Sequence, residues 1–339
     1  MGDGRKALVL RWGAFGDAIQ VTPVFRLLHN DGYEVIFHTM KQGEQVTRHN
    51  PYISKWIVWN KEKKWDYLTW YWKNLALEYG EPHRFINLTG TSENTLILHP
   101  GQAEYKWPKE LRHAQCNLNY WDAALHNSGY RHLFGLKGEL YFTPDEDRAT
   151  VKYLKDARIW DKFVVLWSLS GSAHHKVYPW AEYVAKKFLD RHKDVAIITV
   201  GDNACKVLEW EHPRTVCESG AMKWRMAMSL TRMVDCVIGA ETGILSAAGC
   251  YPTPKVLMLS HSTEENLSKY WKNCISLTPN LFLAPCYPCH QLHYQRQGCL
   301  IESERFGSGA PVCTVYTVPQ DVDDALEAQY QKFKDTRRR

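Results

Sequence analysis

The chain has 339 residues, more than a single hydrophobic core usually serves, so its length favours two domains. Its 45% hydrophobic and 23% charged residues are ordinary for a globular protein, and no run of about 18 apolar residues predicts a transmembrane helix. A net charge of +5 permits an anionic partner without requiring one. The apolar run at 7–10 is too short for a secretory signal, so we expect a cytoplasmic location, with contact at the inner face of the membrane left open.

Strands and helices alternate through the N-terminal half. Apolar runs predict the strands, and recurrence at helical spacing predicts the helix. The predicted elements are, in order, strand 7–12, a glycine-rich loop at 13–17, helix 19–28, and strands 33–37, 56–59 and 85–88. This alternation is typical of a parallel sheet covered on both faces.

A charged helix predicted at 145–157 connects the halves, and the alternation of strands and helices then begins again. The second set is strand 163–167, loop 168–175, helix 180–190, strands 195–200 and 236–239, helix 244–249, strand 255–259 and helix 318–333. We therefore expect a doubly wound α/β fold with domains at 1–150 and 158–318, followed by a C-terminal helix and basic tail at 319–339. Ligands of such sheets bind beyond the carboxyl ends of the strands, where helix N-termini suit phosphate.

Tryptophan and lysine are concentrated between Trp56 and Lys73. The lysines of this stretch are Lys55, Lys61, Lys63, Lys64 and Lys73. Core aromatics with a solvated lysine face are one interpretation, and a surface that binds the acceptor is the other.

Several motifs resemble, in order, those of the lipopolysaccharide heptosyltransferase family (glycosyltransferase family 9). Residues 10–19, LRWGAFGDAI, followed by Thr22-Pro23, are similar to its R-x-G-x-x-G-D loop and the helix after it. Residues 170–180, SGSAHHKVYPW, resemble its small-residue loop that ends in lysine, an aromatic residue and proline. Residues 234–243, VDCVIGAETG, resemble its A-D-x-V-I-x-x-D-T-G segment, and 253–256, TPKV, fits the next strand.

The resemblance implies a GT-B-type fold of two facing Rossmann-like domains with a cleft between them. It implies an inverting glycosyltransferase that needs no metal or other cofactor for catalysis. The donor would be a nucleotide-diphosphate sugar similar to ADP-heptose. The acceptor would be a hydroxyl of a lipopolysaccharide-type glycan or glycolipid, which is consistent with peripheral membrane contact.

The resemblance assigns catalysis to Asp17, which matches the family's general base. A carboxylate within about 3 Å of an acceptor hydroxyl can take its proton as attack proceeds. The position fits an N-cap of the first helix equally well.

The resemblance also implies a donor site. Its residues would be Gly16, Ser170, Gly171, Ser172, Lys176, Asp202, Glu241, Thr242, Gly243 and Ser246. Lys176 would stabilise the charge of the leaving diphosphate, although a loop lysine on the surface is the simpler interpretation. Asp202 would accept from a ribose hydroxyl or serve only in a turn. Glu241 replaces the family's aspartate and Ser246 its histidine, so the transferred sugar is not assumed to be heptose.

Four of the ten cysteines are clustered near the C-terminus, at Cys286, Cys289, Cys299 and Cys313. Four thiolates can hold a structural zinc ion in tetrahedral geometry. Reduced, buried thiols are the alternative. We expect no catalytic zinc here, since the cluster lies outside the motifs above.

Two other functions stay open. The basic balance and the lysine- and tryptophan-rich stretch would suit a glycosyltransferase acting on a modified base in DNA, and steeply salt-dependent DNA binding would indicate it. Glu241 and Ser246 would suit a nucleotide-sugar binding protein without activity, and binding without turnover would indicate that.

Overall fold

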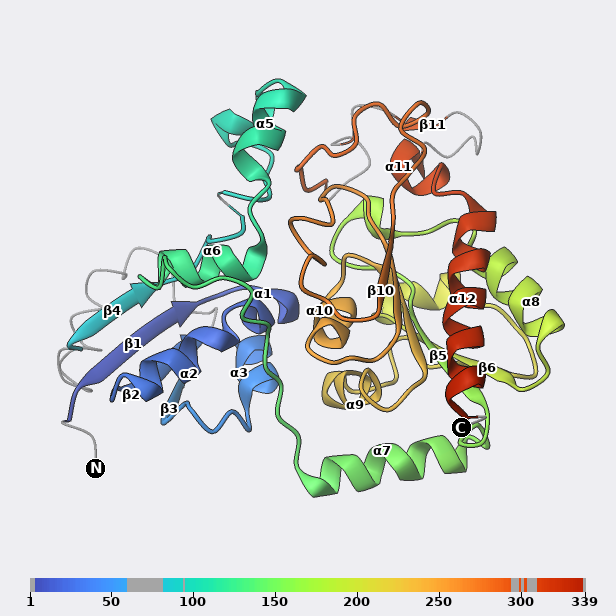
Figure 1. Cartoon of the computed structure of the whole chain (residues 1–339), viewed down its shortest axis with the longest axis horizontal. Coiled ribbons are helices and arrows are strands. Elements are labelled where there is room, and N and C mark those ends of the chain that lie inside the picture. The colour runs from blue at the N-terminus through green and yellow to red at the C-terminus, as the bar shows by residue number, and fades with distance from the viewer. Residues whose placement is uncertain are drawn as a thin grey trace. The chain divides into compact units, whose positions relative to one another are not determined.

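The structure is a computed structural model that describes residues 4–59, 82–93, 95–293, 299, 302–303 and 310–337 (Figure 1). Most of the lysine- and tryptophan-rich stretch, from residue 60 to 81, and the last two arginines lie outside the described residues. The chain forms two compact units. The N-terminal unit contains Met1–Ser92 and Tyr120–Tyr141, and the C-terminal unit contains Glu93–Asn119 and Phe142–Arg339.

The N-terminal unit contains a four-stranded parallel sheet in the order β3-β2-β1-β4. Its elements are β1 (Lys6–Arg11), α1 (Phe15–Gln20), α2 (Thr22–Asn30), β2 (Glu34–Thr39), α3 (Lys41–Thr47), β3 (Lys55–Val58), β4 (Arg84–Asn87) and α6 (Tyr120–Asn127). Val9 and Phe37 face the same side of the sheet and pack with Phe25 of α2 and Leu125 of α6. The apolar runs of the sequence are therefore strands covered by helices, as parallel sheets require.

The helix predicted at 19–28 is two helices. Helix α1 begins earlier, at Phe15, and shortens the predicted loop to Gly13 and Ala14. Helix α2 restarts at Thr22, with Pro23 in its first turn. Proline lacks the N–H that a continuous helix would use there, and it is well tolerated in a first turn, so the chain breaks and restarts at this point.

The C-terminal unit contains a six-stranded parallel sheet in the order β10-β9-β8-β5-β6-β7. Its strands are β5 (Phe163–Ser168), β6 (Val195–Val200), β7 (Thr215–Cys217), β8 (Cys236–Ala240), β9 (Lys255–Met258) and β10 (Cys274–Leu277), with a separate pair β11 (Glu302–Ser303) and β12 (Ala310–Pro311). Its helices are η2 (Ala103–Lys106), α5 (Lys109–Cys116), α7 (Pro144–Asp156), η3 (His174–Lys176), α8 (Ala181–Arg191), η4 (Asn203–Leu208), α9 (Trp224–Leu230), α10 (Gly243–Gly249), α11 (Val312–Val315) and α12 (Pro319–Arg337).

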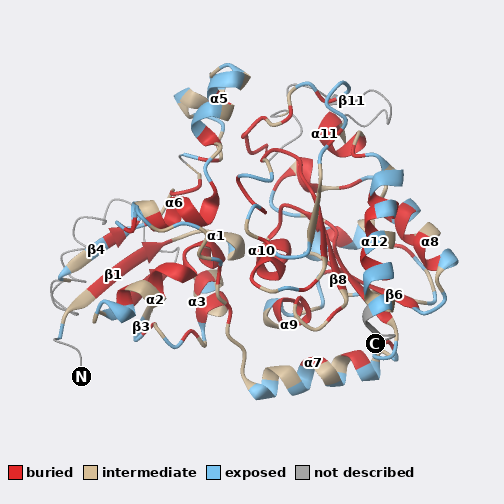
Figure 2. Ribbon diagram, in the orientation of Figure 1, coloured by how far each residue is buried: buried red, intermediate tan, exposed pale blue. Residues whose placement is uncertain are grey.

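Helices α8 and α12 share one core with the six-stranded sheet. Phe163 and Trp167 of β5 point to the same face, because side chains of a strand alternate. Phe188 of α8 and both Leu326 and Tyr330 of α12 pack against that face. The central strands are buried along their whole length (Figure 2). The C-terminal helix, which the sequence predicts as a separate segment, is therefore part of this core.

Residues 93–119 also differ from the predicted boundaries, because they belong to the C-terminal unit. The backbone of Leu98 bonds to His290 and Leu292, and Arg112 Nε donates to the carbonyl of Cys289 at 2.8 Å. These pairings join residues far apart in sequence, so no local pattern predicts them.

Several side-chain contacts join helix α7 to the rest of the C-terminal unit, including Arg232 with Asp147 and Tyr153 with Glu218. Arg225 forms an ion pair with Glu146 at 2.7 Å, and the hydroxyls of Thr150 and Ser229 lie 2.8 Å apart.

No helix within the described residues is long and apolar enough to cross a membrane.

Candidate active site

Asp17 lies directly after β1, in the third position of α1. Its Oδ2 accepts a hydrogen bond from the backbone N–H of Ala14 at 2.6 Å, and its Oδ1 lies 3.0 Å from Arg11 Nη2. The N-cap residue is Ala14, so Asp17 bonds back to the cap without occupying its position. Gly16 is the second residue of the same helix.

The surroundings of Asp17 are tightly packed. The Arg11 side chain is 1% exposed, whereas that of Asp17 is 24% exposed, so the carboxylate reaches solvent and its partner does not. Gly13 has φ +144°, and a Cβ there would lie 2.4 Å from Asp17 Oδ2. Glycine is therefore required for this close approach. Each carboxylate oxygen has two lone pairs, so Asp17 can accept a further proton donor.

His38 is a buried residue of β2, and its register partner in β1 is Leu10. It is fully buried, and its Nδ1 accepts from the indole N–H of Trp12 at 2.9 Å. Burial lowers the pKa of His38 from 6.5 to about 4. Between these values the unfolded chain binds a proton at His38 and the folded chain does not, so acid favours unfolding.

We therefore expect the free energy of unfolding to fall by about 3 kcal/mol through His38 between pH 7 and pH 4. Urea unfolding at pH 7, 6, 5 and 4 measures it. His38→Asn keeps an acceptor for Trp12 and does not titrate, so its stability should fall less over this range. Parallel pH profiles for the two proteins would contradict the expectation.

In the C-terminal unit, the loop after β5 brings together three of the predicted donor-site residues. A Cβ on Gly171 would lie 2.8 Å from Lys176 Cδ and 3.2 Å from Thr242 Cγ2. Lys176 is only 9% exposed, so it is not the surface lysine of the simpler interpretation. Ser168 Oγ, at the end of β5, lies 3.0 Å from Thr242 Oγ1.

Thr242, Gly243 and Ser246 form the start of α10. Thr242 is the N-cap, and its hydroxyl accepts from the N–H of Leu245 at 3.4 Å. Gly243 is the first helical residue, and the N–H of Ser246 bonds to the carbonyl of Thr242. The local sequence explains the geometry, because threonine is a good N-cap and glycine lets the chain approach its neighbours closely.

Glu241 is buried, and its carboxylate is fully bonded inside the unit. Its Oε1 accepts from Ser260 N, Ser262 N and Ser262 Oγ, the last at 2.7 Å. Its Oε2 lies 2.5 Å from both Ser260 Oγ and His261 Nδ1. Burial acts to raise the pKa of Glu241, but His261 and Lys176 act in the opposite direction, and the net pKa lies well below 4.5. The carboxylate therefore holds the loop after β9.

The other predicted donor residues are more exposed. Asp202 caps η4, and its carboxylate accepts from Ala204 N and Cys205 N at 3.0 and 3.1 Å. Ser172 is exposed, and Ser170 Oγ donates to the carbonyl of Gly171 at 3.3 Å. The recorded hydrogen bonds of the Asp202 carboxylate are therefore within its own turn.

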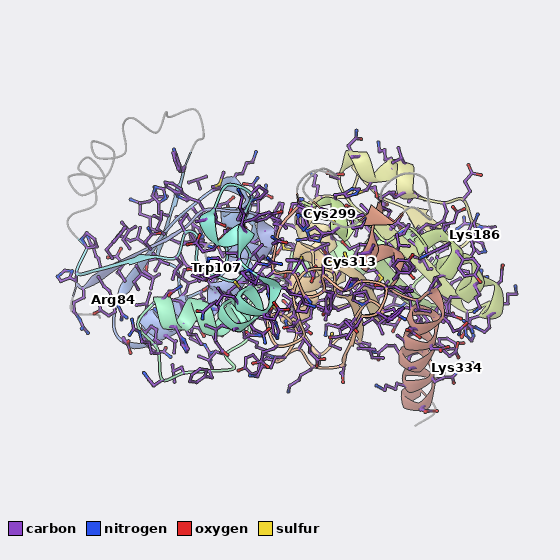
Figure 3. The ribbon with its side chains drawn as sticks, turned by 90° about the horizontal axis from the view of Figure 1, so that it is seen from above. Arg84, Trp107, Lys186, Cys299, Cys313 and Lys334 are labelled. Carbon is purple, nitrogen blue, oxygen red and sulfur yellow. The ribbon has the colours of Figure 1, made fainter. Side chains whose placement is uncertain are left out.

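The four clustered cysteines all lie in the C-terminal unit, and Figure 3 marks Cys299 and Cys313 there. Cys289 and Cys313 are buried, and Cys286 and Cys299 are partly exposed. Burial raises the pKa of Cys289 to about 12 and that of Cys313 well above 9, and the neighbouring cysteines raise both further. Among the described residues, no three of the four sulfur atoms lie within 4.8 Å of one another, so the cysteines would have to move closer together to hold a metal.

Five histidines of the C-terminal unit lie near Glu241 or near one another and were not predicted as site residues. They are His113, His175, His261, His290 and His293. The rings of His175 and His261 lie 4.8 Å apart, and those of His175 and His293 lie 5.4 Å apart. His175 lies within the motif at 170–180, but the histidines come from segments far apart in the sequence, so no local pattern predicts that they meet.

Both candidate sites lie where the strand order changes direction. In the C-terminal sheet β5 is flanked by β6 on one side and β8 on the other, and Lys176 and Thr242 follow β5 and β8. In the N-terminal sheet β1 lies between β2 and β4, and Asp17 follows β1. Ligands of open α/β sheets bind at such points, beyond the carboxyl ends of the strands.

No protein-family model and no curated protein sequence matches the chain. Solved structures with a similar fold include bacterial glycosyltransferases. A glycosyl transferase of family 9 from Veillonella parvula has a TM-score of 0.69 at 12% identity, with 98% of this chain and 99% of that chain covered. The E. coli ADP-heptose LPS heptosyltransferase II has a TM-score of 0.64 at 13% identity, with 97% and 99% covered.

A third similar structure is TibC from enterotoxigenic E. coli, an iron-containing dodecameric glycosyltransferase. Its TM-score is 0.60 at 12% identity, and 98% of this chain and 78% of that chain are covered. At sequence identities of 12–13%, the likeness establishes the fold and nothing more specific. The chain has a GT-B-type α/β fold of two parallel sheets with surrounding helices, as predicted.

Proposed function

We propose that the chain is an inverting glycosyltransferase that takes a sugar from a nucleotide-diphosphate donor without a catalytic metal. The main support for this proposal is that Lys176, Gly171 and Thr242 lie close together beyond β5 and β8, where the strand order of the C-terminal sheet changes direction. A buried ammonium, a glycine that allows close approach and a capping hydroxyl are suited to a diphosphate. The fold likeness to glycosyltransferases over nearly the whole chain supports it.

Asp17 would serve as the general base. Its exposed fraction gives it access to an acceptor hydroxyl, and its bonds to Arg11 and Ala14 fix its orientation. As the acceptor oxygen attacks the anomeric carbon, its proton passes to Asp17 and the bond from that carbon to the diphosphate breaks. Lys176 would stabilise the negative charge that the diphosphate gains.

The donor would be similar to ADP-heptose, the ligand named for one TibC structure. The acceptor would be a hydroxyl of a lipopolysaccharide-type glycan, as the name of the E. coli heptosyltransferase indicates for that protein. A cytoplasmic enzyme in peripheral contact with the membrane would meet both. Because Glu241 is bonded within the protein, we expect it to act on the donor only by positioning the loop after β9.

Cys286, Cys289, Cys299 and Cys313 would hold a structural zinc ion. Zinc would bind the thiolate forms, which burial otherwise disfavours at Cys289 and Cys313. The likeness to an iron-containing protein makes iron the competitor to measure. Metal analysis of the purified protein should find about one zinc per chain for this site. The absence of both zinc and iron would count against it.

The function is tested by incubating the protein with a panel of nucleotide-diphosphate sugars and following release of the nucleoside diphosphate. We expect one donor to be turned over, faster when a lipopolysaccharide-type acceptor is added. Binding of one donor without turnover would favour a non-catalytic nucleotide-sugar binding protein. Turnover only with DNA that carries a modified base would favour the nucleic-acid acceptor.

A further inference from the structure

Three buried side chains of the C-terminal unit place metal-binding atoms close together. One ring nitrogen of His175, one carboxylate oxygen of Glu241 and one ring nitrogen of His261 all lie within 4.8 Å of one another. Across the part of the chain that the structure describes, no other group of three such side chains does so. Both histidines are 1% exposed.

In each histidine, one ring nitrogen makes a polar contact and the other does not. His175 Nδ1 lies 2.9 Å from Ser260 Oγ, and His261 Nδ1 lies 2.5 Å from Glu241 Oε2. Nε2 of each ring is buried and has no hydrogen-bond partner among the described residues. A buried polar atom without a partner is destabilising, and neutral imidazole is a common metal ligand.

The hydroxyl of Ser260 lies among the three potential ligands. It is 2.9 Å from His175 Nδ1, 2.5 Å from Glu241 Oε2 and 3.4 Å from His261 Nδ1. These contacts are made by Nδ1, so an ion held here would replace the Nδ1 hydrogen bonds and either displace the hydroxyl or take it as a fourth ligand, whereas an ion held through Nε2 would leave them in place.

The charges at this position allow one cation. The ligand types favour a cation that prefers nitrogen ligands. His175 and His261 supply imidazoles and Glu241 a carboxylate, and all three side chains are buried. Lys176 acts against a cation, and the Glu241 carboxylate offsets it. Two imidazoles and one carboxylate are a ligand set that zinc and related first-row metals take, whereas magnesium and calcium prefer oxygen.

We propose that His175, Glu241 and His261 bind one first-row transition-metal dication, for which Zn²⁺ is the reference. Zinc bonds of 2.0–2.2 Å place tetrahedral ligand atoms roughly 3.3 Å apart, so the three side chains close around the ion by rotation. This site uses none of the clustered cysteines, although His293 lies between His175 and Cys289. It holds η3 to the loop after β9 and does not depend on the proposed sugar transfer.

The experiment is titration of the metal-free protein with Zn²⁺ by calorimetry and with Co²⁺ by absorption spectroscopy. Thiolate-bound Co²⁺ gives an intense near-ultraviolet charge-transfer band, whereas Co²⁺ on histidine and carboxylate does not, which distinguishes the cysteines. We expect wild-type protein to bind one metal ion without that band. His175→Gln and His261→Gln should each weaken this binding by about 100-fold or more.

His192→Gln is the matched control, because His192 also pairs with a carboxylate, Glu327 at 2.7 Å, and lies outside the group. It should bind metal as wild type does. Ser260→Ala keeps all three ligands and should also bind. Equal binding by wild type and both histidine variants, or charge-transfer spectra for all of the bound Co²⁺, would each overturn the proposal.

Discussion

Asp17→Asn should lower kcat for sugar transfer by about 10²–10⁴-fold, with little change in donor affinity. Asparagine has nearly the same shape and can still accept from Ala14 N, but its amide cannot take the acceptor proton. It also removes the negative charge beside the buried Arg11, so some loss of stability accompanies the loss of rate. Steady-state rates and thermal unfolding, measured on the same samples, separate the two effects.

Glu139→Gln is the control for the loss of stability. Glu139 pairs with Arg26 at 2.8 Å in the same unit, so this variant also breaks an ion pair, without touching Asp17. It should lose stability and keep its rate. Equal rates for Asp17→Asn and wild type would remove Asp17 as the base and leave it the role of bonding to Ala14 and Arg11.

Lys176→Met should raise the Kd for the nucleoside diphosphate by about 10- to 100-fold, because a charged hydrogen bond to phosphate contributes roughly 1.5–3 kcal/mol. Methionine keeps most of the buried stem against Gly171. In wild type, ligand at about 100 times its Kd should add roughly 2.7 kcal/mol to the free energy of unfolding. Thermal unfolding with and without nucleoside diphosphates measures both quantities.

Lys186→Met serves as the comparison. Lys186 lies on the surface of α8, in the same unit, where it pairs with Glu182 at 2.6 Å (Figure 3). It should leave nucleotide binding unchanged. If Lys176→Met binds every nucleoside diphosphate as tightly as wild type does, the donor site lies elsewhere and the proposed function loses its main support.

Much of the fold could be predicted from the sequence. Buried parallel strands are continuous apolar runs, so β1, β5, β6 and β8 are visible as such, and so is the long charged helix α7. The break between α1 and α2 was missed because the apolar spacing continues across Val21, although Pro23 marks it. The short helices α5 and α9 were missed because their patterns are brief.

The candidate site was predictable only in part. Gly171, Lys176 and Thr242 could be named from motifs, and the structure brings them together. The fully bonded state of Glu241 could not be foreseen, because its partners, residues 260–262, lie about twenty positions further on. The same holds for His175 and His261, which only the strand order of the sheet brings close.

The division of the chain has a practical consequence for producing its parts. The polypeptide passes from one unit to the other at Ser92–Glu93, Asn119–Tyr120 and Tyr141–Phe142. A fragment that ends at residue 92 would lack α6, whose Leu125 belongs to the N-terminal core. A fragment that starts at residue 142 would lack α5 and the backbone pairing of Leu98. Neither unit can be expressed intact by a single truncation, so domain-exchange experiments must graft both segments of a unit together.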